Sequence, residues 1–358
     1  MKVYFIGSGL QGCYVPRCLL PLQANGFDGD QTSIIPENNT PENKSKAAQD
    51  ADIIVFHRPE HPGKLELAHH LKSIGKKIVF DNDDTYKDLD GMKFNEYMNE
   101  ERVTRGIAKV NSTIDAFIAE ADLVTTSTEF LAEEYRKLNP NVFVLPNCID
   151  PFYYDEPLRN ENGKIRIGIT GSVAVSGDLE VLIPILKHYQ KNKEVELVVF
   201  SLPPNGNDSI ARKLYKEEYE IFDSLDIEWQ PFVSAHEYPQ KLNSLKIDIM
   251  IIPRKDSYFN RCKSNIKFLE SSLLEIPCIA QGFSDGKSPY QDPKDAEHMI
   301  IVTDNSQWIP EIDKLIADKP KRLEMGRKAR EYVVERYSIE NNANKWVEAY
   351  KTIYGTAK

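Results

Sequence analysis

Short apolar segments alternate with helix-length segments in two successive series, and this alternation restricts the fold more than any other feature. Short apolar runs without a polar face are typical of strands in parallel sheets, which helices cover on both sides. The expected strands lie in residues 2–7, 51–57, 76–82, 121–127 and 141–147, and then in residues 164–172, 195–201, 226–232, 246–254 and 276–282. The sequence therefore predicts an α/β protein with two Rossmann-like, doubly wound domains that face one another across a ligand cleft.

The break between the two series sets the domain boundaries. A turn-forming stretch that begins at Pro146 interrupts the strand pattern, and a polar stretch follows it. We expect an N-terminal domain at residues 1–150, a linker at 151–163 and a C-terminal domain at 164–335. The chain ends in amphipathic helical segments, and we expect residues 336–358 to form a helix that crosses back to the N-terminal domain.

Composition narrows the classes of function. The net charge of −10 argues against a nucleic-acid binder, although a local basic groove could coexist with it. The sequence has no apolar run of the roughly 18 residues that a membrane span needs, and its start, MKVYFIGSG, lacks a signal-peptide layout. The five cysteines are odd in number and form no CxxC pair, which favours a reducing compartment and argues against structural zinc. We therefore expect a cytoplasmic protein.

A glycine-containing turn follows the first strand of each of the two series. Residues 7–12, GSGLQG, fit the GxGxxG pattern, in which glycines let the backbone approach a pyrophosphate. A dinucleotide site should also have an acid at the end of the second strand, and no clear one is present, so a tight turn is the simpler explanation. In the second turn, GITGS, the small residues Gly171 and Ser172 leave space for a diphosphate or a sugar.

Polar side chains also follow two neighbouring strands of the first series. Asp81 and Asp83 in DNDDT resemble the first motif of haloacid dehalogenase-like phosphatases, and the DND triplet resembles the DxD metal site of single-domain glycosyltransferases. In the segment HRPEH, His57 and Glu60 could supply a base or bind the hydroxyl groups of an acceptor. Alternatively, Pro59 sets a turn there and His57 only hydrogen-bonds to the backbone.

A basic segment between Arg254 and Glu270 is the strongest indication of a ligand. Lys263, Lys267 and Glu270 stand at helical spacing, within about 60° of one another, so we expect all three on the exposed face of one helix. Two ammonium groups and a carboxylate suit a ligand with a polyanionic part and a hydroxyl-rich part, such as a nucleotide sugar. A solvated ion pair is the alternative, but a cluster of cations in an acidic chain favours binding.

The same segment resembles a known signature. It is similar to the donor-binding motif of GT-B glycosyltransferases of the large retaining family 4, and the similarity extends over roughly residues 164–350. The matching positions are Phe259, Asn260, Lys263, Ser264, Lys267, Glu270, Pro277, Ile279 and Ala280. The resemblance implies a metal-independent enzyme without a cofactor, which moves a hexosyl or pentosyl group from a nucleotide-sugar donor to a hydroxyl acceptor.

The resemblance also assigns roles in the C-terminal domain. Glu270 would bind the ribose hydroxyls, and Lys263 and Lys267 would neutralise the diphosphate and stabilise it as it leaves. The remaining expected donor contacts are Gly171, Ser172, Arg254, Asn260, Ser264 and Asn265. The chain departs from the family at Cys262, where most members have a first glutamate eight positions before the second.

In the N-terminal domain, the expected roles concern the acceptor. His57, Asp83 and Asp84 would orient the acceptor or the sugar, and with Lys263 they form the expected catalytic set. The expected acceptor contacts are Gly9, Gln11, Arg58 and Glu60.

The sequence leaves several alternatives open. The acceptor is a saccharide or a lipid-linked saccharide by default, and a hydroxymethylated base of phage DNA is the alternative. A phosphatase that uses Asp81 and Asp83 is a second reading. A nucleotide-sugar-binding subunit without catalytic activity is a third, because Cys262 lacks a carboxylate. Oligomeric state does not follow from the sequence.

Overall fold

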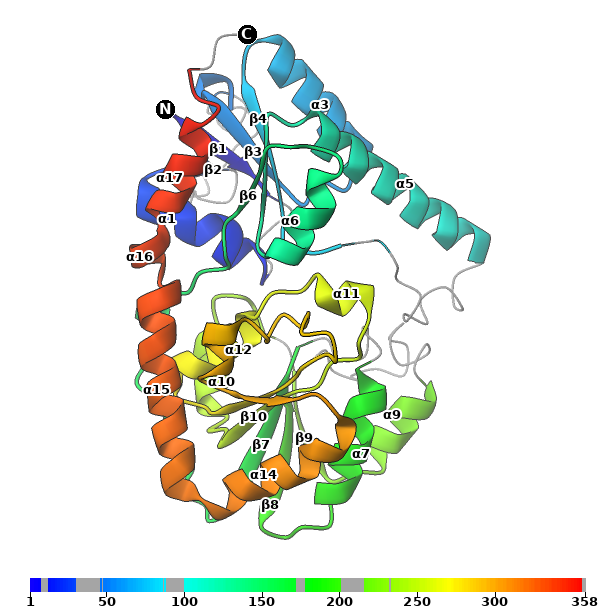
Figure 1. The fold of residues 1–358 in the computed structure, drawn as a ribbon, viewed down its shortest axis with the longest axis vertical. Coiled ribbons are helices and arrows are strands. Elements are labelled where there is room, and N and C mark those ends of the chain that lie inside the picture. The colour runs from blue at the N-terminus through cyan, green and yellow to red at the C-terminus, as the bar shows by residue number, and fades with distance from the viewer. Residues whose placement is uncertain are drawn as a thin grey trace.

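The computed structural model contains two parallel sheets, one above the other in Figure 1, with helices on both faces of each. It describes residues 1–7, 12–29, 46, 48–85, 87, 100–171, 178–200, 216–231 and 233–355. The first six-stranded sheet has the order β2-β1-β3-β4-β5-β6. Its strands are β1 (Val3–Ile6), β2 (Asp28–Gly29), β3 (Ile53–His57), β4 (Lys77–Asn82), β5 (Leu123–Thr126) and β6 (Val142–Val144).

The second six-stranded sheet has the order β12-β11-β10-β7-β8-β9. Its strands are β7 (Ile165–Thr170), β8 (Val195–Phe200), β9 (Ile227–Gln230), β10 (Ile249–Ile252), β11 (Cys278–Gln281) and β12 (Ile300–Val302). Every strand expected from the sequence forms, and the predicted fold class is confirmed. The strands β2 and β12 were missed, since they are two and three residues long and too short to show a pattern.

Helices follow most strands of both sheets. In the first domain they are the π-helix η1 (Val15–Leu19), α1 (Leu20–Asn25), α3 (Pro62–Ser73), α5 (Glu100–Glu120) and α6 (Glu129–Arg136). After the short helix η3 (Pro151–Tyr153), the second domain contains α7 (Leu179–Tyr189), α9 (Lys216–Asp223), α10 (Tyr238–Ser244), α11 (Tyr258–Arg261), α12 (Ile266–Leu273), α13 (Pro293–Ala296), η5 (Asn305–Gln307), α14 (Trp308–Ala317) and α15 (Lys319–Tyr337). The chain ends with α16 (Ile339–Asn342) and α17 (Asn344–Lys351). None of the helices within the described residues is long and apolar enough to cross a membrane.

The chain passes between the domains at two points that touch each other. The Ile149 amide donates to the Tyr337 carbonyl at 3.0 Å, and the Ile339 amide donates to the Ile149 carbonyl at 2.8 Å. Beyond this crossing, α16 and α17 lie beside the first domain, at the top left of Figure 1. There Trp346 and Tyr350 are completely buried in the same apolar cluster as β1. The C-terminal segment is therefore part of the core of the first domain.

Candidate functional site

A buried carboxylate, Asp178, organises the start of the basic segment. It pairs with Arg254, and its Oδ1 atom accepts from the Lys255 amide and the Asn260 Nδ2 at 2.8 Å each. Although burial by itself lowers the pKa of Arg254, the Asp178 carboxylate raises it above its ordinary value. Arg254 is 8% exposed and Asn260 is completely buried. Their side chains hold the segment to the start of α7, and their expected contact with the donor remains a prediction.

Lys263 does not lie on the helix that was expected to carry it. Helix α11 ends at Arg261 and α12 begins at Ile266, so Lys263 occupies the link between two helices. Its Nζ atom lies 2.5 Å from Asp84 Oδ2 of the first domain and 4.0 Å from the centre of the Phe259 ring. The prediction of one exposed face is therefore wrong, and Lys263 spans the cleft between the domains.

Acids neutralise most of the basic segment, and all of them except Asp256 are distant from it in the sequence. Lys255 pairs with Glu180 at 2.8 Å, and Arg261 bonds to both Asp256 and Asp285. Together with the partners of Arg254 and Lys263, each of these cations thus has an acid beside it. The expected positive island is therefore a set of ion pairs.

Lys267 is held differently. Its ammonium group donates to the Thr170 hydroxyl at 3.2 Å and lies over Gly171, where a Cβ atom would collide with it. Burial, with the Arg254 and Lys263 charges, lowers the pKa of Lys267 to about 8 against the opposing effect of Glu270. An ammonium group in this setting gains from the arrival of an anion, because the anion supplies the charge that the site lacks.

Glu270 follows Lys267 on α12 and turns toward α10. It accepts from the Tyr238 hydroxyl at 3.0 Å, and the Tyr238 ring stacks on Phe200 at 5.3 Å between centroids. Burial raises the pKa of the Glu270 carboxyl, against the opposing effects of Lys267 and of the Tyr238 hydroxyl. Glu270 is only partly exposed, not fully exposed as predicted. A half-buried carboxylate beside an aromatic stack suits vicinal hydroxyl groups and the ring of a nucleoside.

The N-terminus of α12 lacks a side-chain cap. Asn265 stands at the N-cap position, yet its Nδ2 atom donates to the buried Asp295 at 2.6 Å. The hydroxyls of Tyr332 and Tyr337 also donate to Asp295, at 2.6 Å and 2.9 Å. Because Asp295 draws the Asn265 side chain away, the helix end keeps its positive pole for an anion. Sequence patterns did not identify Asp295, although it holds Asn265, one of the expected donor contacts.

Ser264 joins the two domains beside this helix end. Its hydroxyl accepts from the Asn147 Nδ2 at 2.8 Å, in a buried contact between the link before α12 and the end of the first domain. Nearby, the rings of Phe130 and Tyr258 meet at 5.7 Å, edge to face. Cys262 is fully buried and belongs to the apolar cluster of the first domain. Burial, with Asp84 second, raises the pKa of its thiol, so Cys262 does not provide a negative charge.

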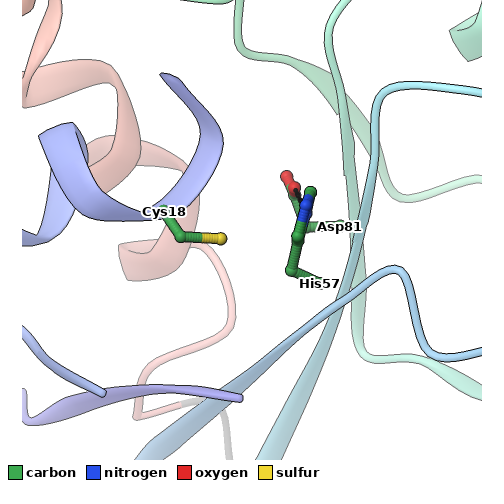
Figure 2. Close-up of side chains that lie close together, drawn as sticks. All are labelled: Cys18, His57 and Asp81. Carbon is green, nitrogen blue, oxygen red and sulfur yellow. Dashed lines mark hydrogen bonds and ion pairs between the residues drawn. The ribbon is translucent and has the colours of Figure 1, made fainter. Parts of the chain in front are cut away.

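A buried ion network lies under the first sheet's carboxyl edge. Asp81 pairs with Arg17, accepts from Thr125 Oγ1 at 2.6 Å and bonds to His57 Nδ1 at 2.9 Å. Burial by itself raises the pKa of Asp81, but Arg17 and His57 outweigh it and hold that pKa well below its usual range. Figure 2 shows Cys18 pointing toward His57 and Asp81. These three could group around a metal by distance, but Arg17 already bonds to both oxygens of the carboxylate.

The hydrogen bonds of Asp81 argue against the alternative that the protein is a phosphatase with Asp81 as its nucleophile. A nucleophilic carboxylate needs a free oxygen facing the substrate, whereas both Asp81 oxygens accept hydrogen bonds from buried donors. His57 is 2% exposed and is held by Asp81. The expected role of His57 in orienting the acceptor remains a prediction. Arg17, the partner of Asp81, was missed because it lies in an apolar helix.

The other candidates of the first domain gather near Lys263. The charges of Asp83, Arg58, Asp84 and Lys263 all act on the Cys13 thiol, whose pKa is raised chiefly by burial. Asp83 is 6% exposed, and its Oδ1 atom has no hydrogen-bond partner among the described residues.

Four further residues were expected at the site. Glu60 lies 3.7 Å from Arg58 at the rim. Gly9, Gln11 and Ser172 lie outside the described residues.

A groove of about 710 Å³ opens between the domains beside Lys263. The first domain contributes the end of β5 and the start of α6 to its wall, and the second contributes Lys263, Asn265 and the loop after β11. The lining residues that carry charge are Glu129, Glu133, Arg261, Lys263, Lys287, Asp292, Asp295, Arg336 and Lys345. This volume is in the range of pockets that bind small molecules.

Comparison with known proteins identifies the architecture. No family model and no curated protein matches the chain. The solved structure of sucrose-phosphate synthase from Thermosynechococcus elongatus is similar to this chain, with a TM-score of 0.69 and 13% sequence identity over 100% of both chains. HepE from Anabaena, solved in complex with UDP, has a TM-score of 0.64 at 12% identity over 98% of this chain and 100% of its own.

These likenesses define the fold as GT-B, two Rossmann-like domains face to face. A putative UDP-N-acetylglucosamine 2-epimerase from Listeria monocytogenes shares it, with a TM-score of 0.55 at 13% identity over 99% of this chain and 97% of its own. At such identities the similarity shows the fold alone. Function therefore has to be argued from the side chains of the cleft.

Proposed function

We propose that the protein is a retaining glycosyltransferase that takes its sugar from a nucleotide-sugar donor bound by the second domain. The observation that carries the proposal is the arrangement of Lys267 and Glu270 on α12. An ammonium group with a lowered pKa lies over a glycine turn and is followed, one helical turn on, by a carboxylate beside an aromatic stack. The first environment suits a diphosphate, and the second suits the hydroxyl groups of a ribose.

In the proposed complex, each part of the donor has its own contacts in the second domain. Its diphosphate lies between Lys267, Lys263 and the uncapped N-terminus of α12, with Gly171 leaving room for the Lys267 ammonium. The ribose hydroxyls bond to Glu270, and the Tyr238 ring forms part of the wall near the nucleoside. Arg254, Asn260 and Asp178 support this segment from beneath. The structure of HepE with UDP supports a uridine nucleotide as the first probe.

The cations around the diphosphate also account for the transfer of the sugar to the acceptor. The bond between the sugar's anomeric carbon and the phosphate oxygen breaks, and a bond to the acceptor oxygen forms on the same face of the sugar. The proton of the acceptor hydroxyl passes to the departing phosphate, so no strong base of the protein is required. Lys263, Lys267 and the α12 amides stabilise the charge that develops on the diphosphate. Because these cations are fixed, we propose that the reaction needs no metal.

The acceptor lies in the groove between the domains. We propose a saccharide or a lipid-linked saccharide, because the α6 wall offers Glu129, Glu133 and the Phe130 ring, which suit the hydroxyls and the apolar face of a sugar. His57, Asp83 and Asp84, together with Arg58, would orient it from the first domain. A DNA acceptor would need a basic approach to the cleft, whereas the cations described here are largely paired with acids.

A thermal-shift panel of nucleotide sugars, with NAD and magnesium as controls, tests the proposal. We expect one nucleotide series to raise the melting temperature and Glu270→Ala to remove that shift. The matched control is Glu297→Ala, which removes an exposed acid of the same domain and should leave the shift unchanged. Transfer by Glu270→Ala at the wild-type rate would contradict the assignment.

The panel also separates the alternatives. A phosphatase would respond to magnesium and release phosphate, and a chelator would stop it. A binding subunit without activity would show the shift but no transfer or hydrolysis of the donor. For the proposed enzyme, we expect a chelator to leave transfer unchanged.

A further inference from the structure

The ion pair between Lys263 and Asp84 places one acid of the first domain directly on a cation assigned to the donor. The Lys263 Nζ and Asp84 Oδ2 atoms are 2.5 Å apart, and their side chains are 26% and 11% exposed. They belong to different domains and are separated by 179 positions in the sequence. A pair so shielded from water is worth more than one on the surface, so it affects any anion that needs Lys263.

Asp84 is the fixed member of this pair. Its Oδ1 atom accepts from the Thr85 amide at 2.9 Å, and its backbone carbonyl accepts from Asn82 Nδ2 at 2.9 Å and from the Tyr135 hydroxyl at 3.1 Å. Lys263, by contrast, is a long side chain on the link between two helices, against the Phe259 ring. When an anion arrives, the Lys263 ammonium is therefore the group that moves.

We infer that Asp84 holds Lys263 in the absence of donor and that the donor's diphosphate displaces it. The inference rests on the proposed function and deepens it. Once Lys263 turns to the phosphate, the Asp84 carboxylate is uncovered next to Asp83, whose Oδ1 has no partner among the described residues. The freed Asp84 oxygen can then accept a hydrogen bond from an acceptor hydroxyl. The donor consequently binds before the acceptor.

If Asp84 instead stayed bound to Lys263 when the donor binds, its removal would have the opposite effect on donor affinity. If Asp84 stayed on Lys263 in the donor complex, it would fix the ammonium for the phosphate, and its removal would weaken donor binding. If Asp84 competes with the phosphate, its removal leaves Lys263 unpaired and strengthens donor binding. The effect of a neutral residue at position 84 on the affinity for a nucleoside diphosphate therefore decides between the two.

The experiment measures the dissociation constant of UDP for the full chain by calorimetry. We expect Asp84→Asn to bind UDP about tenfold more tightly than the wild type, a difference of about 1.4 kcal/mol. Asp115→Asn is the matched control, since it removes an acid of the same domain that pairs with Lys87 at 2.7 Å. That control should bind UDP as the wild type does. Equal or weaker binding by a folded Asp84→Asn would overturn the inference.

A double-mutant cycle tests whether the effect passes through Lys263. In a Lys263→Gln background, Asp84→Asn should no longer strengthen UDP binding. A gain of the same size in both backgrounds would overturn the inference, because it would reflect a general change in charge. If the wild type bound no nucleoside diphosphate at all, the proposed function would fail and this inference with it. Wild-type binding with no gain in Asp84→Asn would refute the inference alone.

Discussion

The Lys267 ammonium occupies the space that a Cβ atom at position 171 would need, so Gly171 and Lys267 form one unit although they are far apart in the sequence. Gly171 also has a φ of +94°, which L-residues with side chains rarely adopt. The turn after β7 thus provides both the backbone conformation and the room for a cation. Neither requirement is visible in the residues around Lys267 alone.

Replacing Gly171 by alanine tests this pairing. We expect the backbone strain to cost about 1 to 3 kcal/mol of stability, and the displaced Lys267 to weaken UDP binding by at least about tenfold. Gly163→Ala is the control, because Gly163 has a φ of +83° and nothing within 4 Å of its added Cβ. It should lose stability and keep the affinity. Equal loss of affinity in both variants, by calorimetry, would show that strain alone is responsible.

The pKa of Lys267 predicts a pH dependence of donor binding. That pKa is lowered to about 8 in the ligand-free protein, and a bound diphosphate should raise it toward or above its ordinary value of 10.5. Binding near pH 8 should therefore take up about half a proton, and affinity should fall by up to about tenfold per pH unit above that. Calorimetry in two buffers of different ionisation enthalpy measures the uptake. Lys267→Gln should abolish it, and uptake unchanged in that variant would contradict the prediction.

The lowered pKa of Lys267 also makes folding stability depend on pH, and here alkaline pH has a favourable effect. Because the folded protein holds this proton less tightly than the unfolded chain, Lys267 opposes folding most below pH 8. Its unfavourable contribution disappears as the pH rises from about 8 to 10.5. Binding and stability should therefore respond to alkaline pH in opposite directions, and Lys267→Gln should flatten both responses.

The fold could be predicted from the sequence because its signal is local. A buried strand such as residues 249–252 is an uninterrupted apolar run, and each such run stands apart from the next. The site was predicted in part, for the same reason. Lys267 and Glu270 stand three positions apart within one helix, and their spacing indicated a shared ligand.

What could not be predicted depends on partners that are distant in the sequence. Asp178 neutralises Arg254 from 76 positions away, so counting charges within the segment overestimated its net charge. The link between α11 and α12 removed Lys263 from the helical face, since the helix-wheel argument assumed one continuous helix. Arg17 lies 64 positions from Asp81 in an apolar helix, where nothing local suggests an ion pair.

Asp295 should control the donor site without touching the donor. In Asp295→Ala, the Asn265 side chain is released and can cap α12, which competes with the diphosphate for the free amides. We expect about tenfold weaker UDP binding and a loss of about 3 kcal/mol of stability. Tyr332→Phe removes one hydrogen bond to Asp295 and leaves Asn265 in place, so it should cost stability and keep the affinity. Unchanged UDP binding in Asp295→Ala would show that the helix end is not the phosphate site.

Asp81→Asn separates a structural role from a catalytic one. Asp81 and Arg17 are both buried, so the substitution leaves the Arg17 charge without its partner. Breaking a buried pair in this way costs about 3 to 5 kcal/mol. We therefore expect a large fall in the urea midpoint. Glu331→Gln removes one member of an exposed pair with Arg327 and should change stability by less than about 1 kcal/mol.

The phosphatase reading predicts the reverse pattern for the same variant. If Asp81 were a nucleophile, Asp81→Asn would keep the wild-type urea midpoint and lose a magnesium-dependent release of phosphate. If Asp81 supports the sheet edge, the variant loses stability, and at a temperature where it remains folded it still binds UDP, because the donor residues belong to the second domain. Measuring the urea midpoint and UDP affinity on the same preparation distinguishes the two outcomes. A variant with wild-type stability would refute the structural role assigned to the Arg17–Asp81 pair.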